Sequence, residues 1–336
     1  TGISRLGDIQ SLMLNPAAFT VTERSMYVNM SIKPPVTESE IGGTSRYSAP
    51  IPFGILAWGI PLGERLKFAA AYSVPKSIVY DDFSVEVAQG ANLIQRYPTY
   101  YLHQFTAAMA YHHDFLSVGL NLHNQIHYFD DIIIHRTFDR LRESTYTFRP
   151  ELGLLIRGEM LSFGVTFTPE TKFKLDTRQI DYDSVLPMNL SSGITFVQDN
   201  RSVSLEARFD KTSAVSDDYK DRLSLHGGYG FRKGHFSYQF GAMYYPSIFE
   251  GAYLFPVNTS SNADTTMVWN EIPTGGTFGK TDQTLITAGF TYHNPKGSLS
   301  FSLVQDVAGS FPLTQVNFSI GLYLDSLKRK INPAID

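Results

Sequence analysis

Histidine is the residue type in this sequence that comes closest to forming a metal site. His103, His112, His113, His123 and His127 lie close together in the sequence. A structural zinc site needs about four ligands at characteristic spacings. On the strands predicted below, these side chains fall at different levels, His103 faces outward, and no two of them have ligand spacing. We therefore predict no metal site and no cofactor.

Acidic pairs and catalytic motifs give no stronger sign of chemistry. Asp130-Asp131 and Asp217-Asp218 offer oxygen ligands of the kind calcium binds, but solvated loop charge explains them better. The sequence has no Gly-x-Ser-x-Gly, no His-Glu-x-x-His and no phosphate-binding glycine loop. Its net charge is −4 and it has no basic cluster, which argues against nucleic-acid binding. We predict that the protein is not an enzyme.

The stretch Asp221–Tyr245 shows the structural unit that must position any site. Apolar side chains alternate there with small or polar ones on both sides of a polar turn at Arg232–His235. The apolar face carries Leu223, Leu225, Tyr229, Phe231, Phe236, Tyr238, Phe240, Ala242 and Tyr244. Side chains alternate between the faces of a strand, so the pattern predicts a β-hairpin. Each strand has about ten residues, enough to cross a bilayer at a tilt, whereas strands of soluble sandwiches usually have about five or six.

The same hairpin pattern repeats along the 336 residues, which contain 24 Phe, 19 Tyr and no Cys. Short turns alternate strictly with long loops, as in an even-stranded barrel of a bacterial outer membrane. We predict an all-β fold, an antiparallel transmembrane β-barrel of about 14 strands in contact with outer-membrane lipids. Residues 1–24 would form a plug or periplasmic segment, residues 25–324 the barrel and residues 325–336 a polar periplasmic tail.

Three apolar residues, Leu56, Trp58 and Ile60, are predicted to face the lumen of this barrel. This orientation follows if Gly63 and Glu64 form a two-residue turn between the second and third strands. An apolar inner wall suits an apolar ligand, because burial there is favourable by roughly 25 cal/mol per Å². We predict that these three residues bind a hydrophobic ligand.

The N-terminal stretch has no strand pattern, and its predicted plug residues are Leu12, Met13, Leu14, Asn15, Pro16 and Ala17. The alternative role of the inner apolar patch is to pack against the three apolar residues of this plug. Several predicted inward positions, among them Gly119 and Gly153, are glycine. Inward glycine leaves room for another segment inside the barrel, although it also lets a strand bend.

Fourteen strands, a short N-terminal segment and the Asn15-Pro16-Ala17 sequence resemble one known family. This is the FadL-like family of outer-membrane long-chain fatty acid transporters and related hydrocarbon-uptake channels, whose N-terminal plug carries an Asn-Pro-Ala sequence. The resemblance implies a monomeric barrel that passes hydrophobic molecules through an interior pocket and out through an opening in the wall. The predicted plug of about 24 residues is shorter than in those transporters. The chain also resembles the barrel components of the type IX secretion system.

Two hypotheses follow for the function. The first is an outer-membrane channel for hydrophobic small molecules of the fatty acid or hydrocarbon type. The alternative is a structural or docking barrel of a secretion complex, in which the loops and the tail contact envelope or secretion-complex proteins.

Overall fold

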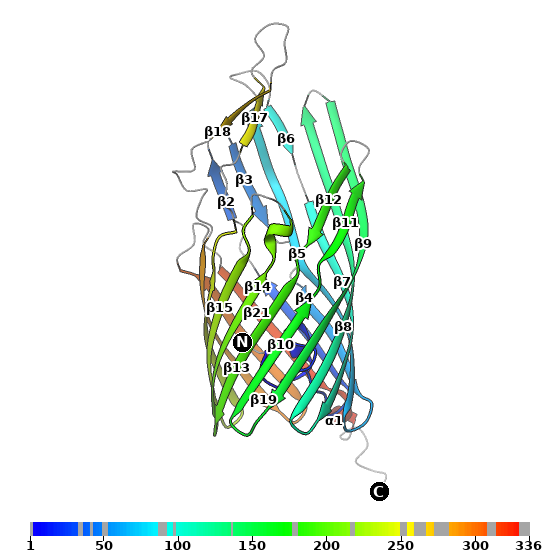
Figure 1. Ribbon diagram of the computed structural model, residues 1–336, viewed down its shortest axis with the longest axis vertical. Helices are drawn as coiled ribbons and strands as arrows, with labels where there is room; N and C mark the ends of the chain where they lie inside the picture. Colours follow the sequence, from blue (N-terminus) through cyan, green and yellow to red (C-terminus); the bar gives the residue numbers. More distant parts are fainter. Residues whose placement is uncertain are drawn as a thin grey trace.

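The fold is seen in a computed structural model of the chain (Figure 1). The structure describes residues 3–32, 36–40, 43–48, 53–86, 93–96, 99–135, 137–176, 181–215, 219–248, 254–258, 267–271, 282–307 and 314–328. Most of the described elements are β-strands. No helix in these ranges is both long enough and apolar enough to cross a bilayer.

Fourteen strands form one closed antiparallel barrel. They are β1 (Ser25–Ile32), β4 (Phe53–Pro61), β5 (Leu66–Glu86), β7 (Thr99–His113), β8 (Leu116–His135), β9 (Thr137–Arg157), β10 (Leu161–Thr168), β13 (Asn189–Gln198), β14 (Arg201–Asp210), β15 (Arg222–Lys233), β16 (Phe236–Tyr245), β19 (Gln283–Asn294), β20 (Gly297–Asp306) and β21 (Thr314–Tyr323). Each strand pairs with the next in this order, and β1 also pairs with β21, which closes the ring. A closed ring leaves no strand edge unpaired. In lipid this is necessary, because no water is present to bond to free backbone groups. The predicted all-β barrel of about fourteen strands is confirmed.

Short turns lie at one end of the barrel, called here the lower end, and long connections lie at the other end (Figure 1). Four of the short turns contain a residue with positive φ, namely Gly63, Asp114, Asp199 and Gly234, as is usual in tight hairpin turns. The helix α1 (Leu324–Lys328) lies at this lower end. The long connections at the other end contain β2 (Val36–Glu40), β3 (Gly43–Ser48), β6 (Leu93–Arg96), β11 (Thr171–Asp176), β12 (Asp181–Leu186), the 3-10 helix η2 (Thr212–Ala214), β17 (Leu254–Asn258) and β18 (Met267–Glu271).

Apolar side chains cover the outer wall, and polar ones face the lumen. On β14, Leu205 is 68% exposed and Val203 47% exposed, whereas Ser204 and Glu206 are buried on the inner face. A continuous surface of exposed apolar side chains is stable only against another apolar medium. The alternation therefore fits a barrel whose outer wall faces lipid.

The predicted inward orientation of Leu56, Trp58 and Ile60 is wrong. Leu56 is 43% and Trp58 41% exposed on the outer wall, and Ile60 lies on the same face of β4. The residues between them face the lumen: Ala57 is 1% exposed, and a Cβ placed on Gly59 would meet side chains of the N-terminal segment. The predicted ligand-binding role of the three residues thus loses the orientation on which it depended.

The cause is a shift of one residue in the pairing of two strands. β4 ends at Pro61 and β5 begins at Leu66, so that four residues form the turn rather than two. Ile60 therefore pairs with Phe68, where the prediction paired Gly59 with Phe68. Because side chains alternate along a strand, a one-residue shift exchanges its two faces.

Hydrogen bonds hold α1 against the residues just before β1. The Arg24 side chain donates from Nε to the Asp325 carboxylate at 2.8 Å, and the amide of Ser326 donates to Glu23 at 2.7 Å. The start of the first strand and the end of the last strand therefore lie side by side at the lower end of the barrel. Residues 329–336 of the predicted tail lie outside the described residues.

Candidate functional site

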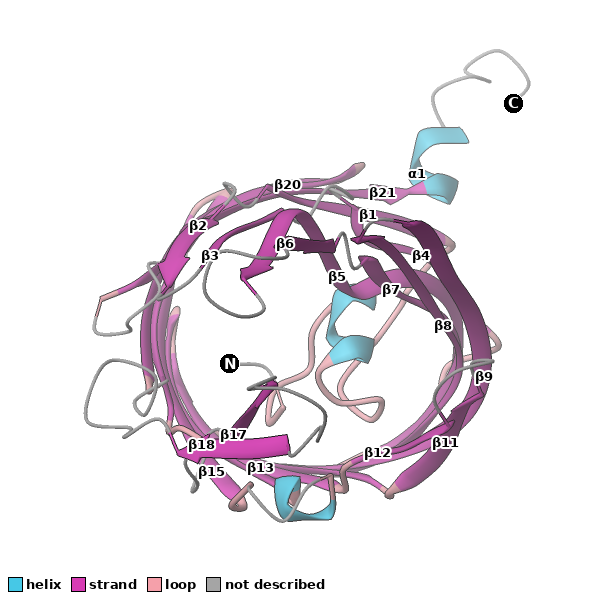
Figure 2. Ribbon diagram, turned by 90° about the horizontal axis from the view of Figure 1, so that it is seen from above, coloured by secondary structure: helices cyan, strands magenta, loops and turns pink. Residues whose placement is uncertain are grey.

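Residues 3–24, called here the N-terminal segment, lie inside the barrel (Figure 2). The segment contains the 3-10 helix η1 (Ile9–Met13), and the Asp8 carboxylate caps its start by accepting a hydrogen bond from the Gln10 amide at 3.2 Å. Burial raises the pKa of the Asp8 carboxyl above its ordinary value, and the bonds from Gln10 oppose this shift. The segment folds back on itself, because the Gly7 amide donates to the Ala18 carbonyl at 3.0 Å.

Asn15 fastens this segment both to itself and to the barrel wall. Its side chain is completely buried and donates to the carbonyl oxygens of Ile3 at 2.7 Å and Leu154 at 3.1 Å. The side-chain oxygen accepts from the amide of Ala17 at 2.8 Å. Since Leu154 belongs to β9, one asparagine connects two parts of the segment to the barrel.

Two paired glycines give the segment the space that it occupies. Gly119 of β8 pairs directly with Gly153 of β9. A Cβ on Gly119 would lie 2.1 Å from the carbonyl carbon of Pro16, and one on Gly153 would lie 2.2 Å from the Asn15 side-chain oxygen. A side chain at either position would collide with the segment. The expectation that inward glycine leaves room for another segment is confirmed at these two sites.

An apolar inner wall does exist, and it consists mainly of alanine on β4, β5 and β7. Its buried residues are Ile55, Ala57, Ala69, Ala71, Ala108 and Ala110. The N-terminal segment covers this wall with Ile9, Leu12, Phe19 and Val21. Sequence reasoning missed it, although the alanines at 69–71 and at 107, 108 and 110 were visible as small apolar residues on both faces of adjacent strands.

The predicted plug residues have different environments. Leu12, Asn15, Pro16 and Ala17 are fully buried between the segment and the barrel. Met13 is partly buried against the apolar wall, and Leu14 is 46% exposed. The residues of the Asn-Pro-Ala sequence are those that lie against the paired glycines Gly119 and Gly153.

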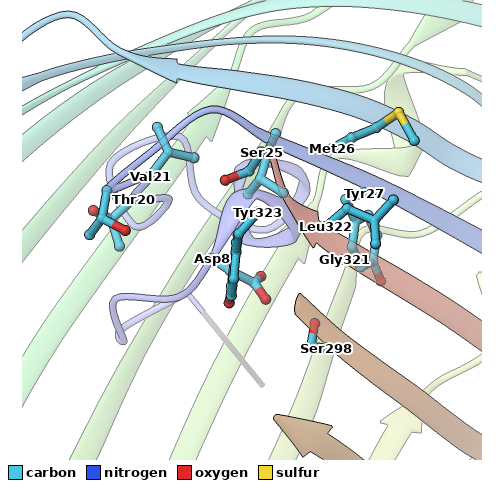
Figure 3. Close-up of a pocket in the computed structure, with 12 residues that line it drawn as sticks. Asp8, Thr20, Val21, Ser25, Met26, Tyr27, Ser298, Gly321, Leu322 and Tyr323 are labelled. Carbon is cyan, nitrogen blue, oxygen red and sulfur yellow. The ribbon is translucent and has the colours of Figure 1, made fainter. Parts of the chain in front are cut away.

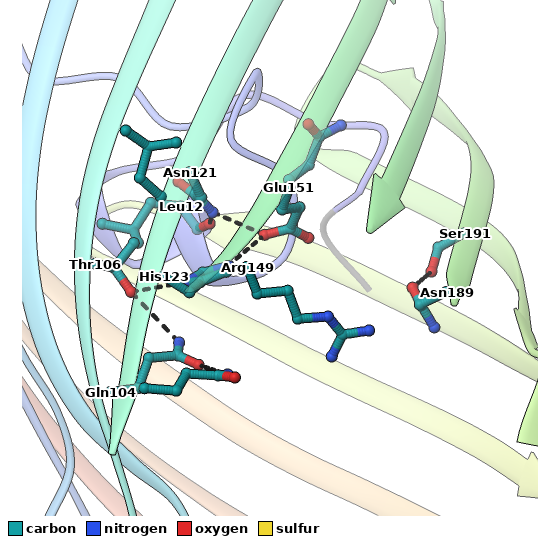
Figure 4. Close-up of polar contacts among 12 residues, drawn as sticks. Leu12, Gln104, Thr106, Asn121, His123, Arg149, Glu151, Asn189 and Ser191 are labelled. Atoms are coloured by element: carbon teal, nitrogen blue, oxygen red, sulfur yellow. Dashed lines mark hydrogen bonds and ion pairs between the residues drawn. The ribbon is translucent and has the colours of Figure 1, made fainter. Parts of the chain in front are cut away.

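A polar network on the inner faces of β7, β8 and β9 joins the segment to the barrel (Figure 4). Asn121 donates from its side chain to the carbonyl of Leu12 at 2.7 Å and to the Glu151 carboxylate at 2.8 Å. The His123 Nε2 lies 3.1 Å from the same carboxylate, and its Nδ1 lies 2.8 Å from the Thr106 hydroxyl. Thr106, Asn121 and His123 are all buried on the inner face of the wall, and their network supports the segment.

The other histidines have separate partners. His103 bonds to the hydroxyl of Tyr72 and His127 to that of Tyr100, both at 2.8 Å. His112 bonds to the Phe19 carbonyl at 3.0 Å. Over the described parts of the chain, no three His, Cys, Asp or Glu side chains are placed to hold a metal ion.

The two acidic pairs also differ. Asp130 accepts hydrogen bonds from Arg140 at 2.6 Å and from Tyr128 at 3.0 Å, so neighbouring side chains already occupy its carboxylate. Asp217 and Asp218 lie outside the described residues.

Charged groups line the lumen on β14 and β15. Asp210 is 3% exposed and accepts from Arg208 Nε at 3.0 Å and from Arg222 at 2.9 Å. Asn189 of β13 donates to the same carboxylate at 2.5 Å. Three partners thus satisfy this buried carboxylate, as a buried charge requires, and this part of the wall is polar.

β5 carries an irregularity next to the alanine wall. Ser73 pairs with Gln104 and Lys76 with Leu102, so two residues of β5, Val74 and Pro75, oppose one residue of β7. Such a β-bulge interrupts the hydrogen-bond ladder and bends the strand. Proline adds to the effect because it has no N–H to donate.

No protein-family model matches the sequence, and no match was found among the curated proteins. Solved structures of similar fold include the toluene transporter TbuX of Ralstonia pickettii, with 13% identity, a TM-score of 0.61, and 96% of this chain and 94% of that chain covered. The toluene transporter TodX of Pseudomonas putida has 10% identity, a TM-score of 0.63 and the same coverage. A FadL homologue of Pseudomonas aeruginosa has 12% identity and a TM-score of 0.63, with 95% of this chain and 94% of that chain covered.

These identities are low, but the superposition extends over almost the whole of each chain. The resemblance to fatty acid and hydrocarbon transporters, expected from the strand number and the Asn-Pro-Ala sequence, is confirmed for the fold. The chain has the fourteen-stranded barrel fold of the FadL, TodX and TbuX transporters.

Proposed function

We propose that this protein is a channel of the bacterial outer membrane that carries hydrophobic small molecules, of the fatty acid or hydrocarbon type. The observation that carries the proposal is the alanine wall of β4, β5 and β7, the larger of the two buried apolar clusters inside the described barrel. Exposing such a surface to water is unfavourable, so it needs an apolar cover. The N-terminal segment supplies that cover at rest, and a hydrophobic ligand supplies it when the segment moves.

The bulge at Val74 and Pro75 provides the route between this wall and the lipid. The bulge follows directly on Ala71 and Ser73 along β5. Interrupted pairing at this point weakens the barrel wall between β5 and β7. A hydrophobic molecule leaving there enters the bilayer without crossing the polar half of the lumen. The toluene transporters of similar fold support this choice of substrate class.

Two neighbouring alanines of β5 allow a matched test. Ala71 is 7% exposed and faces the lumen, whereas Ala70 is exposed on the outer wall. We expect Ala71→Leu to lower the uptake of radiolabelled oleate or toluene by whole cells, because the larger side chain fills the space on the alanine wall. Ala70→Leu should leave uptake unchanged. Equal uptake by both variants, at equal amounts of folded barrel, would contradict the proposal.

The second candidate is a docking barrel in a protein secretion complex. The observation that favours it is the attachment of α1 to Arg24 and Glu23, which holds this helix on the lower rim of the barrel. The Asp325 and Ser326 contacts should be kept in any test, so the chain is truncated after Lys328. Native mass spectrometry of gently purified protein then separates the two functions. A bound fatty acid or hydrocarbon supports transport, whereas stoichiometric partner proteins that the truncated chain loses support docking.

A further inference from the structure

Two cavities lie between the N-terminal segment and the wall opposite its anchoring strands. The lower one, of about 200 Å³, lies at the end with the short turns, and Asp8, Thr20, Ser298 and Tyr323 are among its lining residues (Figure 3). The other has about 320 Å³ and is lined by residues of η1, β1, β16, β19, β20 and β21. The segment therefore covers one side of the lumen and leaves space along the other.

The two cavities follow one another along the same strands. On β20, Ser298 lines the lower cavity and the next two inward positions, Ser300 and Ser302, line the upper one. On β21, Gly321 lines the lower cavity, and Ser319 lines the upper one. Successive inward positions of a strand are two residues apart, so these positions form one uninterrupted row. The row runs from mid-barrel to the lower end.

Tyr27 marks the junction, because it lines both cavities. Its hydroxyl donates to the side-chain oxygen of Gln10 at 2.9 Å. This bond connects the wall with the N-terminal segment. It is a single hydrogen bond between two neutral groups, and such a bond adds little net stability because each group can bond to water instead.

The polar side chains of the upper cavity are all uncharged. Its polar lining consists of hydroxyl and amide side chains, and none of the described residues that line it is charged; among them are Gln10, Asn29, Thr291, Ser300, Asn317 and Ser319. Hydroxyl groups both donate and accept hydrogen bonds. They can therefore replace the water around another neutral hydroxylated molecule, while a permeating ion would lose hydration without an opposite charge to compensate it.

We propose that this row is a second, hydrophilic passage, which conducts water and small uncharged hydroxylated solutes, such as glycerol, past the N-terminal segment. The passage uses the wall of β19, β20, β21 and β1, whereas the hydrophobic route uses β4, β5 and β7. This passage does not require the part of the segment that covers the alanine wall to move. The inference goes beyond the transport of hydrophobic molecules and does not depend on it.

Swelling of proteoliposomes in iso-osmotic glycerol tests the passage with the full chain. We expect faster swelling than in liposomes without protein, and slower swelling in potassium glutamate of equal osmolarity. Ser302→Trp should return the glycerol rate to that of empty liposomes, because the indole fills the upper cavity. Leu303→Trp is the matched control: residue 303 is the next residue of β20 and faces the lipid, with 39% exposure. Glycerol swelling equal to that of empty liposomes, or equal rates for both variants, would overturn the proposal.

Thiol labelling gives an independent readout if Ser302→Trp does not fold. The 336 residues contain no cysteine, so a single introduced thiol is the only thiol in this chain. We expect Ser300→Cys to react with a charged, membrane-impermeant maleimide, because its thiol faces an aqueous cavity. Leu299→Cys, on the lipid-facing side of the same strand and outside both cavities, should not react. The opposite order of reactivity would show that the row is not a water-filled passage.

Discussion

Glycine at an inward position of β8 is required by contact rather than by backbone conformation. The backbone of Pro16 approaches Gly119 so closely that an added Cβ would lie 2.1 Å from its carbonyl carbon. Because the nearest atoms belong to backbone, they cannot move aside as a flexible side chain does. We expect Gly119→Ala to destabilise the protein by about 1–3 kcal/mol, the usual cost of overpacking. Urea unfolding in detergent micelles measures this change, and proteolysis of residues 3–24 shows whether the segment has left its place.

Gly227 on β15 is the control for this substitution. A Cβ there would meet only the Leu205 side chain, at an ordinary contact distance of 3.7 Å. Gly227→Ala should therefore leave stability and protease resistance unchanged. If both variants lose the same stability, contact with the N-terminal segment is not the reason for glycine at position 119.

Single residues could be predicted from the sequence only in part. An inward glycine is visible in the strand pattern, and so is the Asn15-Pro16-Ala17 sequence. The partners of Asn15 were not, because the Leu154 carbonyl is 139 residues away in the chain and its approach depends on how the whole barrel closes. A hydrogen bond between such distant groups leaves no local signal.

At the scale of the strand, the size of a register error matters less than whether it is odd or even. From the sequence, a two-residue turn at His113-Asp114 between β7 and β8 is expected to place Phe105 opposite Leu122, whereas the structure pairs Ala107 with Leu122. This error of two residues left every side chain on its predicted face. The error of one residue at the turn between β4 and β5 reversed the face of β4 and with it the predicted ligand site. The apolar pattern could not settle the turn, because β4 is apolar on both faces.

The orientation of β4 predicts how charged residues are tolerated. Trp58 faces lipid, so Trp58→Arg should reduce the amount of folded barrel, since a lipid-facing arginine costs about 2–4 kcal/mol at the bilayer mid-plane and less toward its edges. Gln239→Arg should be tolerated, because Gln239 lines the upper cavity of the lumen. The heat-modified mobility of each variant in gel electrophoresis measures the folded fraction. Normal assembly of Trp58→Arg would contradict the lipid-facing orientation of Trp58 and indicate that it faces the lumen.

At the scale of the whole molecule, the ring of strands closes without any strand pairing to the N-terminal segment inside it. β1 pairs with β21 from Ser25 and Tyr323 to Ile32 and Val316, so strands alone complete the barrel. The number of strands was predictable because each hairpin carries its own pattern of turn and alternation. The side of the lumen that the segment covers was not, because it depends on which strands carry small inward residues and on how those strands become neighbours.

Deleting most of the N-terminal segment while keeping all fourteen strands tests whether the ring forms without it. We expect a chain lacking residues 3–20 to form the same heat-resistant barrel, because no strand pairing in the ring involves those residues. Its conductance in planar bilayers should rise well above that of the full chain, since the space occupied by Leu12, Asn15 and Phe19 becomes available to ions. The intact chain, measured in the same bilayers, is the control. Loss of the folded form would mean that the segment is needed to build the ring, and unchanged conductance would mean that the segment does not limit ion flow.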